Sequence, residues 1–238
     1  MKKLILTLFI SSLSCFLIGQ NAYWTVYDMY VENGHENEVI GAIDKFMKTD
    51  AGKSMPALSV SVMLFAPSDI KTTHRLAFIS PDKAIMAKMY TGVLQQTTDF
   101  QLMESTLNSS WHNVGAYLGK SLYSTPLPTD NYETVIGLHV TDPGKYLAAF
   151  KKFSDGVHAK YDGKIGMSLH QFYSGQESGM THVVVVATDT FENLLGFTDE
   201  IYQSDLFKAL QAEVKDIRKV LTNTTSATLA RYNQPTGQ

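Results

Sequence analysis

The segment Tyr132-Glu133-Thr134-Val135 matches Tyr23-Trp24-Thr25-Val26 near the start of the chain. Further matches occur at nearly the same offset, which gives an internal period of roughly 107 residues. They pair Ser80-Pro81-Asp82 with Ala187-Thr188-Asp189, and Thr98-Asp99-Phe100 with Ser204-Asp205-Leu206. Few residues are identical between the copies, so the prediction of a repeat rests mainly on the shared order of sequence patterns. The chain is therefore predicted to contain two copies of one unit.

Both copies show the same succession of strand and helix patterns. Aromatic and β-branched runs predict strands, and apolar residues at three- and four-residue spacing predict helices. In the first copy we expect strands at 23–31, 57–65, 74–79 and 114–122, and helices at 36–48 and within 81–107. In the second we expect strands at 133–140, 165–173, 181–187 and 226–232, and helices from 142 and within 190–221. Each of the two long helical regions is predicted to break into two helices. The order β-α-β-β-α-β is that of a ferredoxin-like unit.

The clearest helix start is Asp142-Pro143, an N-cap residue followed by a first-turn proline. Tyr146, Phe150, Phe153 and Val157 continue from it as one apolar stripe. Ser204 or Asp205 is a second cap candidate, placed before another such stripe. Both signals support helices in the second copy.

Two such units suit a single barrel. A four-stranded sheet with helices on one face leaves its other face uncovered, and a second sheet is the simplest cover. We therefore predict an α+β fold in which two tandem ferredoxin-like units form an intrachain pseudo-dimeric α/β barrel. The expected divisions are a first repeat at 20–122, a linker at 123–131 containing Pro126 and Pro128, and a second repeat at 132–238.

The N-terminus is predicted to be a secretory signal peptide at residues 1–19. Lys2 and Lys3 precede an almost continuously apolar run, after which Gly19-Gln20-Asn21 returns to small and polar residues. We expect a secreted or periplasmic protein, cleaved after Gly19 or Gln20, with a retained membrane anchor as the alternative. Cys15 is the only cysteine of the chain, and lipoprotein anchoring there is a less favoured alternative. The mature chain would then have no thiol and no disulfide.

The order of elements resembles the dimeric α/β-barrel superfamily. Within it, the segment Tyr202-Gln203-Ser204-Asp205-Leu206-Phe207-Lys208-Ala209-Leu210 is similar to proteins like the antibiotic-biosynthesis monooxygenases. Many members build the barrel from two identical chains, whereas this chain would fuse both halves. The resemblance implies a range of activities that includes cofactor-free oxygenases, isomerases, haem proteins and plain binders. The histidine common in the monooxygenase-like members has no counterpart at Asp199-Glu200-Ile201.

Strand alternation predicts which side chains face the inside of the barrel. The expected inner sets bring polar groups together between apolar walls, which is the usual composition of a ligand site. The predicted ligand-binding residues are Trp24, Asp28, Tyr30, Ser61, His139, Ser168 and His170. Of these, His139, His170 and Asp28 are the candidates for catalysis, since a histidine beside a carboxylate suits a general base. The alternative is that these residues are hydrogen-bonded in the interior and have only a structural role.

Composition excludes several classes of partner. A formal net charge of −3 offers no basic surface for nucleic acid. The chain contains no recognised zinc motif, dinucleotide or phosphate loop, or nucleophile elbow, so we expect neither metal nor cofactor. Haem stays open, because it needs only one axial histidine. No membrane contact is expected after cleavage, and the barrel would be a monomer or a homodimer.

Three functions follow. The first is an exported barrel that binds a small, partly apolar molecule inside. The second is a cofactor-independent monooxygenase or isomerase with an interior histidine as base. The third is a structural envelope protein with a solidly packed barrel. The residues leave open whether the protein is an enzyme.

Overall fold

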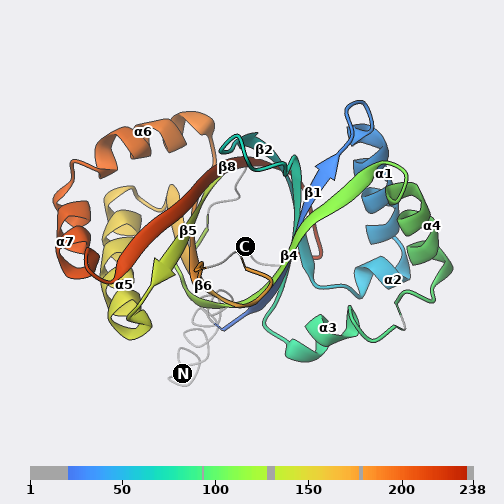
Figure 1. The fold of residues 1–238 in the computed structure, drawn as a ribbon, viewed down its shortest axis with the longest axis horizontal. Coiled ribbons are helices and arrows are strands. Elements are labelled where there is room, and N and C mark those ends of the chain that lie inside the picture. Colours follow the sequence, from blue (N-terminus) through green and yellow to red (C-terminus); the bar gives the residue numbers. More distant parts are fainter. Residues whose placement is uncertain (1–20, 93, 128–131, 177–178, 235–238) are drawn as a thin grey trace, which may run out of the picture.

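A computed structural model describes residues 21–92, 94–127, 132–176 and 179–234. The predicted leader with Cys15, and residues 128–131 of the predicted linker, lie outside these residues. Within them, eight strands form a closed barrel in the order β1-β3-β2-β8-β5-β7-β6-β4, with antiparallel neighbours throughout (Figure 1). The strands are β1 Tyr23–Val31, β2 Ala57–Phe65, β3 His74–Ser80, β4 Trp111–Ser124, β5 Tyr132–Val140, β6 Ile165–Ser174, β7 His182–Thr188 and β8 Arg218–Tyr232.

Two long strands close the barrel. β4 pairs with β1 on one side and with β6 on the other, and β8 pairs with β5 and with β2. The contacts β4·β6 and β2·β8 join residues 21–127, the first half, to residues 132–234, the second half. Because every strand has two neighbours, the barrel leaves no unpaired edge for association with other chains.

The helices lie outside the barrel, in one group on each half (Figure 1). They are α1 Glu36–Met47, α2 Asp50–Lys53, α3 Lys83–Lys88, α4 Thr98–Leu107, α5 Pro143–Lys160, α6 Phe191–Ile201 and α7 Asp205–Val214. One buried core lies under α1 and α4, and a second lies under α5, α6 and α7. Leu138, Val140 and Leu169 point from the strands into the second core, on the helix-facing side that alternation predicts. In the described residues no helix is long and apolar enough to cross a membrane.

The predicted helix starts are confirmed. The Asp142 side chain accepts a hydrogen bond of 3.0 Å from the Lys145 backbone N–H, with Pro143 in the first turn of α5. The Ser204 hydroxyl accepts one of 3.1 Å from Phe207 N–H at the start of α7. Each satisfies an N–H group that the helix itself leaves unpaired, which fixes where the helix begins.

Two boundaries differ from expectation. The helical region predicted to reach residue 221 ends at Val214, and Arg218 already begins β8. Val214 and Ile217 have helical spacing, but pairing of Arg218 with Val140 on β5 decides the local structure. Likewise β4 begins at Trp111, before the predicted start of its strand, because its first residues pair with β1. The local pattern gave no sign of either pairing.

A hydrogen-bond pattern recurs in the two halves. The Thr73 hydroxyl accepts from Val31 N–H at 2.8 Å, and the Thr181 hydroxyl accepts from Val140 N–H at 2.9 Å. Each threonine precedes a buried histidine, His74 or His182, whose Nδ1 contacts its hydroxyl. The start of the third strand is thus tied to the end of the first strand in the same way in both halves.

Candidate functional site

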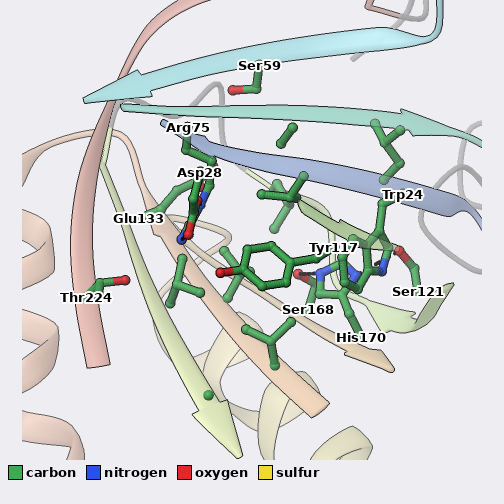
Figure 2. A pocket seen from close by; sticks show the side chains of 18 of the residues that line it. Trp24, Asp28, Ser59, Arg75, Tyr117, Ser121, Glu133, Ser168, His170 and Thr224 are labelled. Carbon is green, nitrogen blue, oxygen red and sulfur yellow. Dashed lines mark hydrogen bonds and ion pairs between the residues drawn. The ribbon is translucent and has the colours of Figure 1, made fainter. Parts of the chain in front are cut away.

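The barrel encloses a cavity of about 1520 Å³, lined by residues from all eight strands. Its volume exceeds the roughly 300–1,000 Å³ of an ordinary small-molecule site. Side chains from the inner face of each strand surround it, with polar groups gathered at two places (Figure 2). One place, the charged end, contains Asp28, Arg75, Glu133 and Arg231. The other, the aromatic end, contains Trp24, Ser121, Ser168, His170 and Phe172.

Four of the seven predicted ligand-binding residues line this cavity. They are Trp24, Asp28, Ser168 and His170. Alternation on β1 and β6 therefore placed these side chains on the correct face. Whether they contact a ligand stays a prediction.

The other three predicted residues are not among the lining residues, which corrects their expected position. Tyr30 and His139 lie on their strands just beyond the last pairs with β3 and β7, at Met29 and Leu138. Tyr30 is 37% exposed and stacks on His112, and His139 Nδ1 lies 2.6 Å from the Gly179 carbonyl oxygen. Both residues keep the predicted parity and remain paired on one side, with His112 on β4 and Lys219 on β8, but they lie beyond the end of the pairing with β3 and β7.

Ser61 is buried but lies outside the lining. The pairing of β2 with β8 shifts register between Val60 and Ser61, and again between Met63 and Phe65. Each shift interrupts the strict alternation on which the inner set of β2 was predicted. Phe65, which lies four residues after Ser61 and is therefore on the same face by strict alternation, is 60% exposed and stacks on Phe191.

At the charged end, Asp28 and Arg75 form a bidentate ion pair. Arg75 Nε donates to Asp28 Oδ1 at 2.7 Å, and Nη2 donates to Oδ2 at 3.0 Å. Both side chains are largely buried, and cross-strand pairing of β1 with β3 sets them opposite each other. The two parallel hydrogen bonds occupy both oxygens of the Asp28 carboxylate.

Glu133 lies beside this pair but is held less firmly than Asp28. Its Oε1 is 3.9 Å from Arg231 Nη2, which is an ion pair at longer than hydrogen-bond distance. Burial raises the pKa of Glu133, and the nearby Arg231 and Arg75 guanidinium groups act in the opposite direction. The site therefore holds one carboxylate fixed by two hydrogen bonds and one that is loosely held.

At the aromatic end, His170 lies between two serine hydroxyls. Its Nδ1 is 2.9 Å from Ser121 Oγ, and its Nε2 is 2.7 Å from Ser168 Oγ. Burial lowers the pKa of His170 to about 4, so the ring is neutral at pH 7. A neutral imidazole donates through one nitrogen and accepts through the other, so one of the two serine hydroxyls keeps its hydrogen for another acceptor. Trp24 and Phe172 form the adjoining wall, with ring centroids 5.3 Å apart.

Four important lining residues were missed from the sequence: Arg75, Tyr117, Ser121 and Glu133. Glu133 lies six residues before His139 on β5, an even spacing, so the alternation that predicted His139 inside already pointed to it. Arg75 follows from its register opposite Asp28, but this register is known only from the structure. Tyr117 on β4 lies between the two ends of the cavity (Figure 2).

No metal centre is evident in the part of the chain that the structure describes. There, no group of three or more His, Cys, Asp or Glu side chains could hold a metal ion. Both ring nitrogens of His170 are engaged by serine hydroxyls, so neither is presented to a haem iron in this arrangement. The lining combines polar and apolar side chains and includes a second histidine, His158.

Comparison with known proteins supports the fold. No protein-family model and no curated protein matches the chain. Among solved structures, it is similar to a candidate monooxygenase from Fusobacterium nucleatum subsp. nucleatum ATCC 25586, with a TM-score of 0.61 and 12% identity over 90% of this chain and 95% of that one. A candidate monooxygenase from Lactobacillus acidophilus NCFM gives 0.59 and 9% over 90% and 96%, and an anthrone oxidase-like protein gives 0.56 and 9% over 94% and 100%. The chain has the dimeric α/β-barrel fold, and identities this low establish the fold alone.

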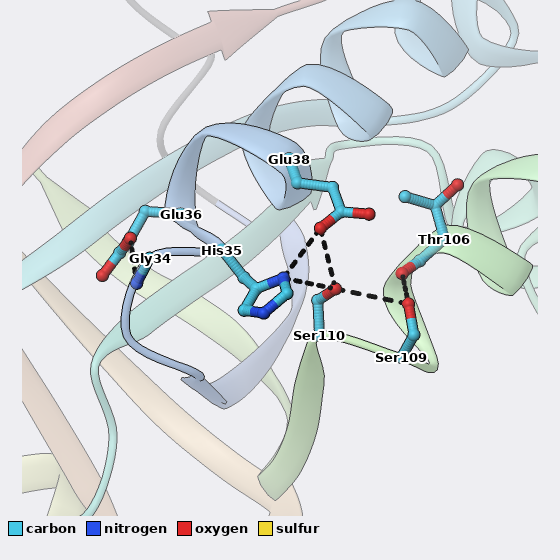
Figure 3. A network of polar contacts seen from close by, with 7 residues as sticks. All are labelled: Gly34, His35, Glu36, Glu38, Thr106, Ser109 and Ser110. Atoms are coloured by element: carbon cyan, nitrogen blue, oxygen red, sulfur yellow. Dashed lines mark hydrogen bonds and ion pairs between the residues drawn. The ribbon is translucent and has the colours of Figure 1, made fainter.

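A second polar network lies outside the barrel, where α1 begins (Figure 3). His35 Nδ1 is 2.8 Å from Glu38 Oε2, and the Ser110 hydroxyl donates to the same oxygen at 3.2 Å. Ser109 donates to the Thr106 carbonyl oxygen at 2.8 Å. The network joins the start of α1 to the residues just before β4. Ser110 and Glu38 approach the same ring nitrogen of His35, so the arrangement is a structural clamp rather than a catalytic triad.

We expect His35 to titrate above the ordinary histidine pKa of 6.5, because it hydrogen-bonds to Glu38. A raised pKa means that the pair stabilises the fold below the unfolded-state value, and this contribution is lost as pH rises through the folded pKa. Proton NMR of the imidazole Cε1–H signals would measure the shift. Glu38→Gln should return His35 to its ordinary range, whereas Glu213→Gln, on the other half, should not. An unshifted His35 in the parent protein would contradict the clamp.

Proposed function

We propose that the protein binds a small, partly apolar organic molecule inside its barrel. The supporting observation is the cavity of about 1520 Å³ with a charged end and an aromatic end. A barrel that served only as structure would gain stability by filling this space with side chains, because voids cost packing energy. The envelope-structure hypothesis is therefore disfavoured.

In the part of the chain that the structure describes, three polar atoms on residues of the cavity wall lack hydrogen-bond partners. Trp24 Nε1, Ser59 Oγ and Thr228 Oγ1 are buried and have no hydrogen-bond partner among the described residues. All three residues line the cavity. Leaving a buried donor unsatisfied costs about 1–3 kcal/mol. The three atoms are themselves shielded from the cavity, so a ligand could satisfy them only if these side chains turned toward it.

The experiment is native mass spectrometry of the chain purified from its own host without refolding. An added mass that is lost on denaturation is the expected result, and its value would identify the ligand class. The same spectrum gives the mass of the chain itself. We propose that residues 1–19 direct export, so the measured mass should be that of a chain that begins at Gln20. Lipidation at Cys15 would give a larger mass.

Binding can also be tested with anthrone, a planar aromatic ketone. The chain has two tryptophans, Trp24 and Trp111, so Trp111→Phe leaves Trp24 as the sole reporter on the cavity wall. Anthrone should quench this fluorescence with saturation, and Ala77→Phe, which fills part of the cavity without adding a tryptophan, should weaken binding. The matched control is Val220→Phe, which adds the same side chain at an exposed position. Quenching by anthrone that is unchanged in a correctly folded Ala77→Phe variant would place the ligand elsewhere.

A second candidate function is oxygenation or isomerisation of an enolisable substrate without a cofactor. It is favoured by the fold shared with two candidate monooxygenases and an anthrone oxidase-like protein. Such chemistry begins with removal of a proton from the substrate, for which the wall supplies several titratable groups. We further propose that the two halves are tandem ferredoxin-like units, as the repeated Thr73 and Thr181 hydrogen bonds suggest.

A further inference from the structure

The two carboxylates at the charged end differ in how firmly they are held. Asp28 receives hydrogen bonds on both oxygens from Arg75, at 2.7 and 3.0 Å. Within the described residues, the Glu133 carboxylate forms one ion pair, with Arg231 at 3.9 Å, and no hydrogen bond. Asp28 would have to give up two charge-assisted hydrogen bonds to accept a proton, whereas Glu133 would give up none.

Glu133 is placed to reach a ligand. It lines the cavity, and its side chain is 22% exposed while the backbone is fixed by pairing with both β7 and β8. The charged and titratable groups that face it are Arg231 from β8, Arg75 from β3 with its partner Asp28 from β1, and Tyr117 from β4 (Figure 2). A rigid strand thus presents a loosely held carboxylate toward the centre of the barrel.

The other candidate bases are less suited. His170 has both nitrogens engaged by Ser121 and Ser168, and with a pKa of about 4 it is a weak base. His139 lies beyond the last pair of β5 with β7, and its Nδ1 is 2.6 Å from the Gly179 carbonyl oxygen. Burial shifts the pKa of Glu133 upward, toward the range in which a carboxylate is an effective general base.

We propose that Glu133 is the proton acceptor of the cavity, acting on a carbonyl compound whose acidic C–H group lies next to, or is conjugated with, the carbonyl. This inference rests on the proposed binding function and adds a catalytic residue and a substrate class to it. Arg75, held in orientation by Asp28, faces the substrate oxygen. The apolar part of the substrate packs toward Trp24 and Phe172.

The step balances within the protein and its ligand. The C–H bond of the substrate breaks and an O–H bond forms on Glu133. The electron pair moves into the substrate and places negative charge on its carbonyl oxygen, where the Arg75 guanidinium stabilises it. When the proton on Glu133 is replaced by a deuteron from the solvent, delivery of that deuteron to the same carbon gives isotope exchange, and delivery of a proton to another carbon gives isomerisation. No oxidant is required.

The experiment follows exchange of the two C10 hydrogens of anthrone for deuterium, in D₂O without oxygen, by mass spectrometry. The parent protein should accelerate exchange over buffer, and Glu133→Gln should lower the enzymatic rate by about 10²–10⁴-fold, as expected for loss of a general base. Glu192→Gln is the control for removal of an exposed carboxylate. Anthrone binding, from Trp24 fluorescence, is measured on the same samples.

The outcomes separate the two proposals. Retained binding with lost exchange in Glu133→Gln supports Glu133 as the base. Exchange at the parental rate in that variant, or binding by the parent protein without acceleration, overturns the inference and leaves the binding function intact. No binding by the parent counts against the proposed function, and a ligand-independent measurement then decides on Glu133. In ¹³C NMR its carboxyl carbon should titrate above the ordinary glutamate range, and a value below that range would overturn the assignment.

Discussion

Replacing Arg75 by methionine is expected to lower the free energy of unfolding by about 3–5 kcal/mol, because it leaves the Asp28 charge buried without a partner. Asp28 is 5% exposed, and Arg75 supplies both of its side-chain hydrogen bonds. Urea denaturation followed by circular dichroism would measure the change.

The control is the double variant Asp28→Leu with Arg75→Met, which removes both charges. Replacing a buried ion pair with apolar groups is often neutral or stabilising, so most of the lost stability should return. A double variant as unstable as Arg75→Met alone would show that the pair is not the cause. This result would also weaken the role of Asp28 in orienting Arg75.

Phe150→Ala is expected to cost about 3–5 kcal/mol of unfolding free energy, since it creates a void in the core under α5. Phe150 is 1% exposed, and its ring centroid lies 6.4 Å from those of both Tyr123 and Tyr146. The matched control is Phe65→Ala, at a side chain that is 60% exposed. Similar midpoints in urea for the two variants would contradict the position of this core.

Local signals in the sequence predict much of the secondary structure. Apolar spacing and the capping residues Asp142 and Ser204 place their helices correctly because both depend on neighbours within one turn. The extension of β4 and β8 beyond their predicted starts could not be found this way. These segments are strands because β1 and β5 lie beside them, and such long-range pairing overrides local propensity.

The same distinction applies to the candidate site. Trp24, Asp28, Ser168 and His170 were placed on the cavity wall by a two-residue period that holds along regular strands. The method failed for Ser61, where the register shifts, and for Tyr30 and His139, which lie beyond the last pair with one of their two neighbouring strands. It also gave no partners, so the ion pair of Asp28 could be seen only once strand order and register were known.

All eight described strands belong to one polypeptide, so the two halves of the cavity wall need not carry the same residues. In a barrel made from two identical subunits, every wall residue occurs twice, and a bound molecule has two equivalent orientations. Here the sequence repeat aligns Trp24 with Glu133, so an indole in one half corresponds to a carboxylate in the other. A single mutation alters one end of the cavity and leaves the other end intact. We therefore expect each chain to bind one ligand in a single orientation. Recognition and reactivity can then evolve separately at the aromatic end and the charged end.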